Sequence, residues 1–162
     1  MSFATMSGPV RCGTVKEGAG ENTGLVQLAR SVTVASSVMR TSPTAQALMT
    51  LPAGAKIFRI NVEVVTAISG GSVTNVGVVI GDSGTANKYV TTFNSGTSAA
   101  KVAQATVDAA MQVAQTNNIG TTDVTLYGTF TAAGGNPTAG AIVITVEYVQ
   151  RGSDGAQVPA SA

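Results

Sequence analysis

Residues 58–64 read FRINVEV, and apolar and polar side chains alternate strictly along this stretch. One face carries Phe58, Ile60, Val62 and Val64, and the opposite face carries Arg59, Asn61 and Glu63. A two-residue period is typical of an antiparallel strand with one buried and one solvated face. The stretch therefore predicts a strand whose even-numbered side chains point into a core.

The same period recurs on both sides of this stretch. Residues 124–131 place Val124, Leu126 and Phe130 inward, and residues 142–149 place Ile142, Ile144, Val146 and Tyr148 inward. The outer face of 142–149 is half apolar, which suits either a central strand or a subunit contact. Residues 25–34 form an earlier candidate with Val26, Leu28, Val32 and Val34 on one side, and shorter candidates cover residues 45–51, 73–80 and 88–93.

Turn residues separate these runs at 52–54, 70–72, 82–84, 94–96 and 134–137. Gly and Asn allow the positive φ of tight turns, and Pro interrupts a strand ladder. Many short strands with turns between them predict an all-β fold, an antiparallel, jelly-roll-like β-sandwich with an extended N-terminal arm. Residues 99–115 fit helical and strand spacing equally well, and the all-β context favours strand from about Val107.

The predicted organisation is an arm at 1–24, a sandwich domain at 25–150 and a tail at 151–162. Five glycines and Pro9 interrupt the arm, which is interpreted either as a disordered terminus or as a segment that orders against a neighbouring subunit. With 162 residues, the chain suits one domain that needs no metal or disulfide to fold.

Composition and charge narrow the function classes. Charged residues make up 10% and the net charge is +1, which favours association, so we expect the protein to work in an assembly. Residues 1–60 hold six basic and two acidic side chains, enough to dock on an acidic protein surface but too sparse for nucleic acid. The sequence also predicts no membrane span, no secretion signal and, with the single Cys12, no intrachain disulfide. We therefore expect the protein to be made and kept in a cytoplasm, or to leave it when the cell lyses.

Motifs for catalysis are sparse. The chain has no histidine, which removes the commonest general base and metal ligand. The string Gly81-Asp82-Ser83-Gly84 matches the loop around the chymotrypsin-like nucleophile, but without histidine it is interpreted as a β-turn in which Asp82 binds its own backbone and Gly84 is left-handed. Glu63 and Glu147 are interpreted as solvated charges that discourage edge pairing. Cys12 is interpreted as an incidental thiol, and we expect no catalytic residue, cofactor or metal site.

Three stretches together carry a family resemblance: residues 51–57 (LPAGAKI), 120–127 (GTTDVTLY) and 141–149 (AIVITVEYV). Their order and phrasing over about residues 25–150 resemble small structural proteins of tailed-bacteriophage virions, of the capsid decoration (cement) or head-fibre type. The resemblance implies a β-sandwich, often a homotrimer, that binds the major capsid protein on the assembled shell and has no catalytic residues to carry over.

The implied function is decoration and stabilisation of the outer capsid surface by binding across capsid subunits, after assembly in the host cytoplasm. The expected docking strand lies in the arm, with Phe3, Val10, Arg11, Val15 and Lys16 as its contacts. The alternative is a tail or fibre module that recognises a host glycan or surface protein through loops at 81–97 and 132–138. A third hypothesis, a hydrolase using Glu63 or Asp123, would need two paired carboxylates.

Overall fold

The computed structural model describes residues 26–99, 101–104 and 119–150. In these ranges the chain forms eight strands and one 3-10 turn, η1 (Ser36–Val38). The strands are β1 (Val26–Ala35), β2 (Gln46–Leu51), β3 (Lys56–Ser69), β4 (Asn75–Gly81), β5 (Val90–Asn94), β6 (Lys101–Gln104), β7 (Val124–Ala133) and β8 (Ala139–Gln150). Outside the ambiguous segment at 99–115, every stretch predicted as a strand is a strand, with boundaries shifted by a few residues.

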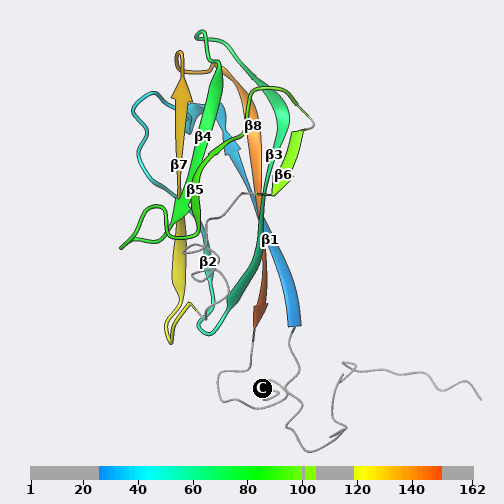
Figure 1. Ribbon diagram of the computed structural model, residues 1–162, viewed down its shortest axis with the longest axis vertical. Coiled ribbons are helices and arrows are strands. Elements are labelled where there is room, and N and C mark those ends of the chain that lie inside the picture. Colours follow the sequence, from blue (N-terminus) through cyan, green and yellow to red (C-terminus); the bar gives the residue numbers. More distant parts are fainter. Residues whose placement is uncertain (1–25, 100, 105–118, 151–162) are drawn as a thin grey trace, which may run out of the picture.

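The strands form two four-stranded sheets that face each other (Figure 1). The first sheet has the order β1-β8-β3-β6 and the second has the order β2-β7-β4-β5, and every pairing between these strands is antiparallel. The predicted antiparallel β-sandwich is confirmed. The pairs are also nested along the chain, β1 with β8, β2 with β7, β3 with β6 and β4 with β5, and we interpret this nesting as a jelly roll.

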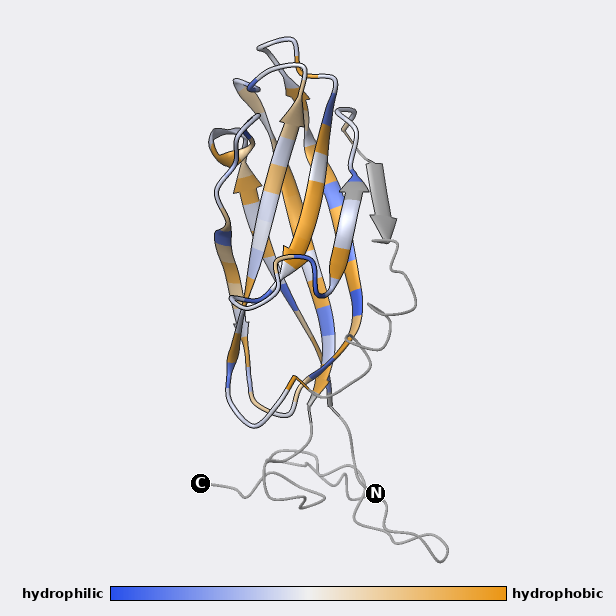
Figure 2. Ribbon diagram, turned by 60° about the vertical axis from the view of Figure 1, so that its left-hand side comes forward, coloured by the Kyte–Doolittle hydropathy of each residue, from blue (hydrophilic) through white to orange (hydrophobic). Residues whose placement is uncertain are grey.

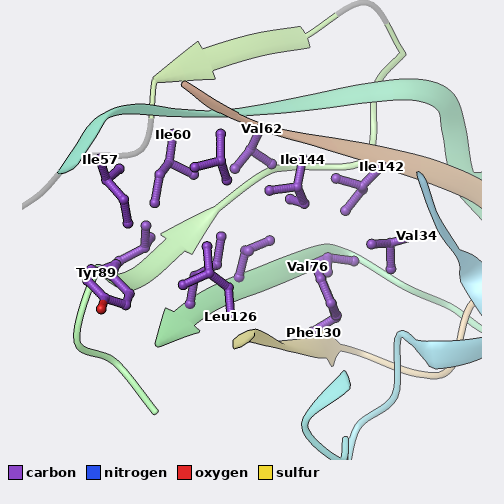
Figure 3. Close-up of a cluster of buried hydrophobic side chains, with 14 of the residues drawn as sticks. Val34, Ile57, Ile60, Val62, Val76, Tyr89, Leu126, Phe130, Ile142 and Ile144 are labelled. Carbon is purple, nitrogen blue, oxygen red and sulfur yellow. The ribbon is translucent and has the colours of Figure 1, made fainter. Parts of the chain in front are cut away.

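The core lies between the sheets and consists of aliphatic side chains around a few aromatic rings (Figure 3). From the first sheet it takes Ile60, Val62, Val64, Ile142, Ile144 and Val146, and from the second Val76, Val78, Ile80, Leu126 and Phe130, all fully or almost fully buried. Figure 2 shows the alternation directly, because hydrophobic and hydrophilic residues follow one another along the strands. The two-residue period therefore located most of the core.

For two residues, Phe58 and Leu28, the prediction of an inward-facing side chain was wrong. Phe58 is 61% exposed, because a register shift between Ile57 and Arg59 makes it an extra residue in β3 and moves Ile57 into the core. Leu28 is 38% exposed near the start of β1, although Val34 at the other end of the same face is buried.

The ambiguous segment at 99–115 is described only at Ala99 and in β6, so Val102 and Ala103 lie in a strand and not in a helix. The strand expected from Val107 lies outside the described residues, as do the arm at 1–24 and the tail at 151–162. The division into arm, sandwich and tail therefore stays a prediction. Within the described ranges, no helix has the length and apolar character to span a membrane.

Both ends of the described chain lie at one end of the sandwich, which we call the base. Val26, the first residue of β1, pairs with Gln150, the last residue of β8. The opposite, distal end holds the β3–β4 and β7–β8 turns, which contact each other: the backbone nitrogen of Thr138 donates to the carbonyl of Ser69. Gly70 and Gly71 in the first turn have φ of 89° and 58°, a conformation that favours glycine. The sandwich therefore has two distinct ends, and the described chain begins and ends at the base.

Candidate functional site

The Gly81–Gly84 string lies where β4 ends and the β4–β5 loop begins, and Asp82 organises this loop. One carboxylate oxygen of Asp82, Oδ1, accepts the backbone N–H groups of Gly84 at 2.9 Å and Thr85 at 2.8 Å. The other, Oδ2, accepts Lys88 Nζ at 2.7 Å. The predicted turn, in which Asp82 binds its own backbone, is confirmed. The prediction of a left-handed conformation at Gly84 was wrong, because Gly84 is not among the described glycines with positive φ.

The charged side chains of this loop, Asp82 and Lys88, are bound to each other and Asp82 is also bound to the loop backbone. Burial raises the pKa of Asp82, but the hydrogen bonds from Lys88, Thr85 and Gly84 outweigh it, so the pKa lies below its ordinary value. The hydrogen bond to Asp82 in turn raises the pKa of Lys88. Ser83 is exposed, and a chain without histidine offers it no imidazole to take its proton. The loop has the chemistry of a rigid turn and lacks that of an activated nucleophile.

Two adjoining hollows lie beside this loop on the outer face of the second sheet. Their volumes are about 430 and 490 Å³, and both are lined by Asp82, Ser83, Gly84 and Tyr127. The first also reaches Ala45 and Thr129, and the second reaches Asp123 and Thr125. We call the pair the β7 hollows. Their lining combines small apolar side chains with hydroxyls, carboxylates and the half-buried ring of Tyr127.

The carboxylates of the hydrolase hypothesis do not come together. Glu63 lies in β3 of the first sheet, whereas Asp123 precedes β7 of the second sheet. Asp123 Oδ1 accepts the backbone N–H of Ala53 at 2.9 Å and so holds the β2–β3 turn. The structure instead brings Asp123 and Asp82 to one hollow, and Asp82 is committed to Lys88 and its own loop. Among the described residues, no group of three His, Cys, Asp or Glu side chains could hold a metal ion.

Glu147 has a different role from the one predicted. It lies in β8, between β1 and β3, so its charge does not guard a sheet edge. Its carboxylate accepts Asn61 Nδ2 and Gln27 Nε2, each at 3.4 Å, and Arg59 lies 3.9 Å away. β8 is a central strand, as one of the two interpretations of its half-apolar outer face requires.

Phe58, next to Arg59 of this polar cluster, is the most exposed large apolar side chain of the described residues, at 61%, and Val65, further along β3, follows at 42%. The Arg59 guanidinium lies 5.8 Å from the centre of the Phe58 ring, so the bulge in β3 presents an aromatic and a cation together. Strict alternation in the sequence hid this feature, since nothing in FRINVEV marks the extra residue.

The predicted arm contacts, Phe3, Val10, Arg11, Val15 and Lys16, lie outside the described residues, as does Cys12.

Comparisons with known proteins give a likeness of fold. No protein-family model and no curated protein sequence matches the chain. Among solved structures, a chain in the cyanophage Pam1 capsid asymmetric unit matches at 21% identity with a TM-score of 0.53, covering 91% of this chain and 98% of that one. A chain in the acidic stable capsid structure of Helicobacter pylori bacteriophage KHP30 has 18% identity and a TM-score of 0.46, covering 85% of this chain and 95% of that one. A chain in the capsid of Ralstonia phage GP4 has 19% identity and a TM-score of 0.48, covering 86% of this chain and 91% of that one.

Proposed function

We propose that this chain is a non-enzymatic structural protein of a phage virion, which decorates the outer capsid surface and stabilises it by binding across capsid subunits. The observation that carries the proposal is the likeness of fold to a chain in the Pam1 capsid asymmetric unit, which extends over 98% of that chain. A role on the capsid agrees with a rigid sandwich of low charge, whose described residues hold their polar groups in turns and cross-strand clusters.

The proposed partners are the major capsid protein and further copies of this chain, as a homotrimer. A protein that binds across a seam between subunits adds apolar burial that the bare shell lacks, at about 25 cal/mol per Å² before association costs. Many copies on one shell turn a modest contact into avidity. The arm residues Phe3, Val10, Arg11, Val15 and Lys16 are the proposed shell contacts, and the base, where the chain enters and leaves the sandwich, would face the shell.

The arm hypothesis is tested by deleting residues 1–24, with deletion of residues 151–162 as the matched control at the same end of the sandwich. Both variants should remain folded β-sandwiches, as judged by a β-type far-UV circular dichroism spectrum and a cooperative thermal transition. We expect the arm deletion alone to abolish co-sedimentation with purified shells and the rise in shell melting temperature. Full attachment without the arm would refute its role, and failure of the full chain to bind shells would refute decoration. Native mass spectrometry of the full chain tests the trimer.

The β7 hollows favour a second candidate, a tail or fibre module that binds a host glycan. A glycan array probed with the full chain tests this, with Tyr127→Ala as the variant that removes the ring and Thr131→Ala, an exposed residue of the same strand, as the control. Glycan binding that Y127A loses and T131A keeps would support the second candidate. Immunogold labelling of virions separates the two, because decoration predicts label over the head and receptor binding predicts label at the tail.

A further inference from the structure

The edge of the first sheet formed by β1 is long and regular. Over the described residues, β1 pairs only with β8, and its ten residues form ten consecutive pairs without a register shift. At about 3.3 Å per residue the edge is about 33 Å long. Every second residue of such a strand directs its N–H and C=O groups away from the sheet, so the edge is a template for one more strand.

The two edge strands of the second sheet are short or interrupted, as protected edges usually are. On the second sheet, β2 has a register shift between Ala47 and Met49 and is followed at once by Pro52, and β5 has only five residues and a register shift against β4. On the first sheet, the other edge strand, β6, is described over Lys101–Gln104 alone. Compared with β2 and β5, β1 is longer and has no register shift over its described residues.

The side chains of β1 also leave its edge open. Gln27, Ala29, Ser31 and Thr33 are exposed and uncharged. The one charged residue of the strand, Arg30, donates to the carbonyl of Thr50 in β2, so its guanidinium is turned toward the second sheet. No lysine or proline blocks an incoming strand here, in contrast to the usual protection of long edges.

We propose that in the free protein the β1 edge is occupied by the chain's own residues 10–16, paired antiparallel to β1 as a fifth strand of the first sheet. Residues 1–25 lead directly into β1, so an antiparallel return needs only a reversal, and residues 17–25 contain Gly18, Gly20, Asn22 and Gly24 for it. Residues 10–16 read VRCGTVK, and at about 3.3 Å per residue they span about 23 Å, which fits the edge. A tethered segment also has an effective concentration in the millimolar range, which a second copy does not reach in dilute solution.

The sole natural cysteine, Cys12, lies within residues 10–16 and serves as the probe. Ala29→Cys introduces a thiol on the β1 edge, and Ala47→Cys introduces the same exposed thiol on β2, the edge of the other sheet. Dilute full-length protein without any shell is treated with a short bis-maleimide, and peptide mass spectrometry identifies the linked residues. We expect an intrachain link between Cys12 and the cysteine of A29C at a several-fold higher yield than in A47C, and none in a C12S/A29C protein.

Equal yields in A29C and A47C would overturn the proposal, because they indicate an arm that samples both sheets alike. Covalent dimers in place of the intrachain link would overturn it in favour of a second copy. As a measurement that needs no substitution, amide hydrogen exchange of β1 should become at least tenfold faster when residues 1–24 are deleted, while exchange of β5 stays unchanged. Unchanged exchange of β1 would also overturn the proposal, and all of these results are independent of shell binding.

Discussion

Phe58 and Phe130 are the same residue type in opposite surroundings, one 61% exposed at the bulge of β3 and the other fully buried in β7. Truncating a buried phenylalanine removes its transfer free energy and leaves a cavity, which typically costs about 3–5 kcal/mol. We therefore expect Phe130→Ala to lower the free energy of unfolding by about 3–5 kcal/mol, and Phe58→Ala to change it by less than about 0.5 kcal/mol.

Urea unfolding of the full-length variants, followed by circular dichroism, measures both free energies. Phe58→Ala is the control for the substitution itself, since it removes the same atoms from a site in solvent. A loss of several kcal/mol for Phe58→Ala would show that the phenyl ring is covered in the free protein and would contradict the bulge geometry. Equal losses for both variants would contradict the register of β3 on β8 as a whole.

At Asp82 the prediction concerns pH. Because the pKa of Asp82 is lowered in the folded state, the ionised carboxylate stabilises the fold above its unfolded pKa of about 3.9, and this contribution is lost as the pH falls through the lower, folded value. Asp82→Asn keeps an acceptor for the loop amides but loses the charge that Lys88 binds. We expect the variant to be about 0.5–1 kcal/mol less stable at pH 7, since Lys88 is partly exposed.

Unfolding free energies at pH 7, 5, 4 and 3 test this sign. The difference between the natural protein and D82N should be constant from pH 7 to 5 and should shrink below about pH 4, where the natural protein itself becomes protonated at Asp82. A difference that grows on acidification would mean that the carboxylate is destabilising, contrary to its three hydrogen bonds.

At the scale of elements, two glycines at the β4–β5 loop, Gly81 and Gly84, differ in their surroundings. A Cβ at Gly81 would overlap the carbonyl of Thr85 and the backbone of Ala86, whereas a Cβ at Gly84 would make an ordinary 3.5 Å contact with the Asp82 side chain. Gly81→Ala must therefore move loop backbone, and we expect a loss of about 1–3 kcal/mol in unfolding free energy. Gly84→Ala should stay within about 0.5 kcal/mol. Thermal unfolding of the two variants side by side checks the contrast, and a tolerated Gly81→Ala would contradict the closed loop.

The elements also show what sequence periodicity can and cannot predict. The alternation in 142–149 located four buried side chains of β8 correctly, because a central strand without a bulge keeps its two-residue period throughout. The same rule was wrong at Phe58, since a bulge costs little and depends on the partner strand, which the local sequence does not specify. Glu147 was misread for the same reason: a charge in mid-strand has one meaning at an edge and another beside Arg59, Asn61 and Gln27.

For the candidate site, the hydrogen bonding within one loop could be predicted from the sequence, whereas the contact between distant segments could not. The Asp82 turn follows from the residues of one loop, and the sequence predicted it. The β7 hollows combine Ala45, the loop at Asp82 and the stretch from Asp123 to Tyr127, and only the pairing of strands distant in sequence brings these three together. The sequence indicated the loop at 81–97 as a binding loop, and residues 82–84 of this loop do line the hollows. It did not indicate that Tyr127 of β7 lines them as well.

At the scale of the whole molecule, the nested pairing of strands gives the sandwich two distinct ends. β8 runs from the distal end at Ala139 to the base at Gln150, twelve residues or about 40 Å. The described chain begins at Val26 and ends at Gln150, both at the base. Ser98 is exposed beside Thr97, whose carbonyl accepts the backbone N–H of Ile68 near the distal end of β3. A protein attached to a shell by its arm should therefore present its distal end outward.

Two epitope insertions test this orientation: one after Ser98 and one at the N-terminus of the arm. In the free protein both epitopes should bind antibody equally, because neither lies in the packed core. On particles carrying the protein, we expect the epitope after Ser98 to bind antibody and the arm epitope to lose at least tenfold in binding, since the base is turned to the shell. The reverse pattern would contradict attachment through the base. Equal labelling of both epitopes on particles would mean that the sandwich lies on its side, with a sheet face and not the base as the contact surface.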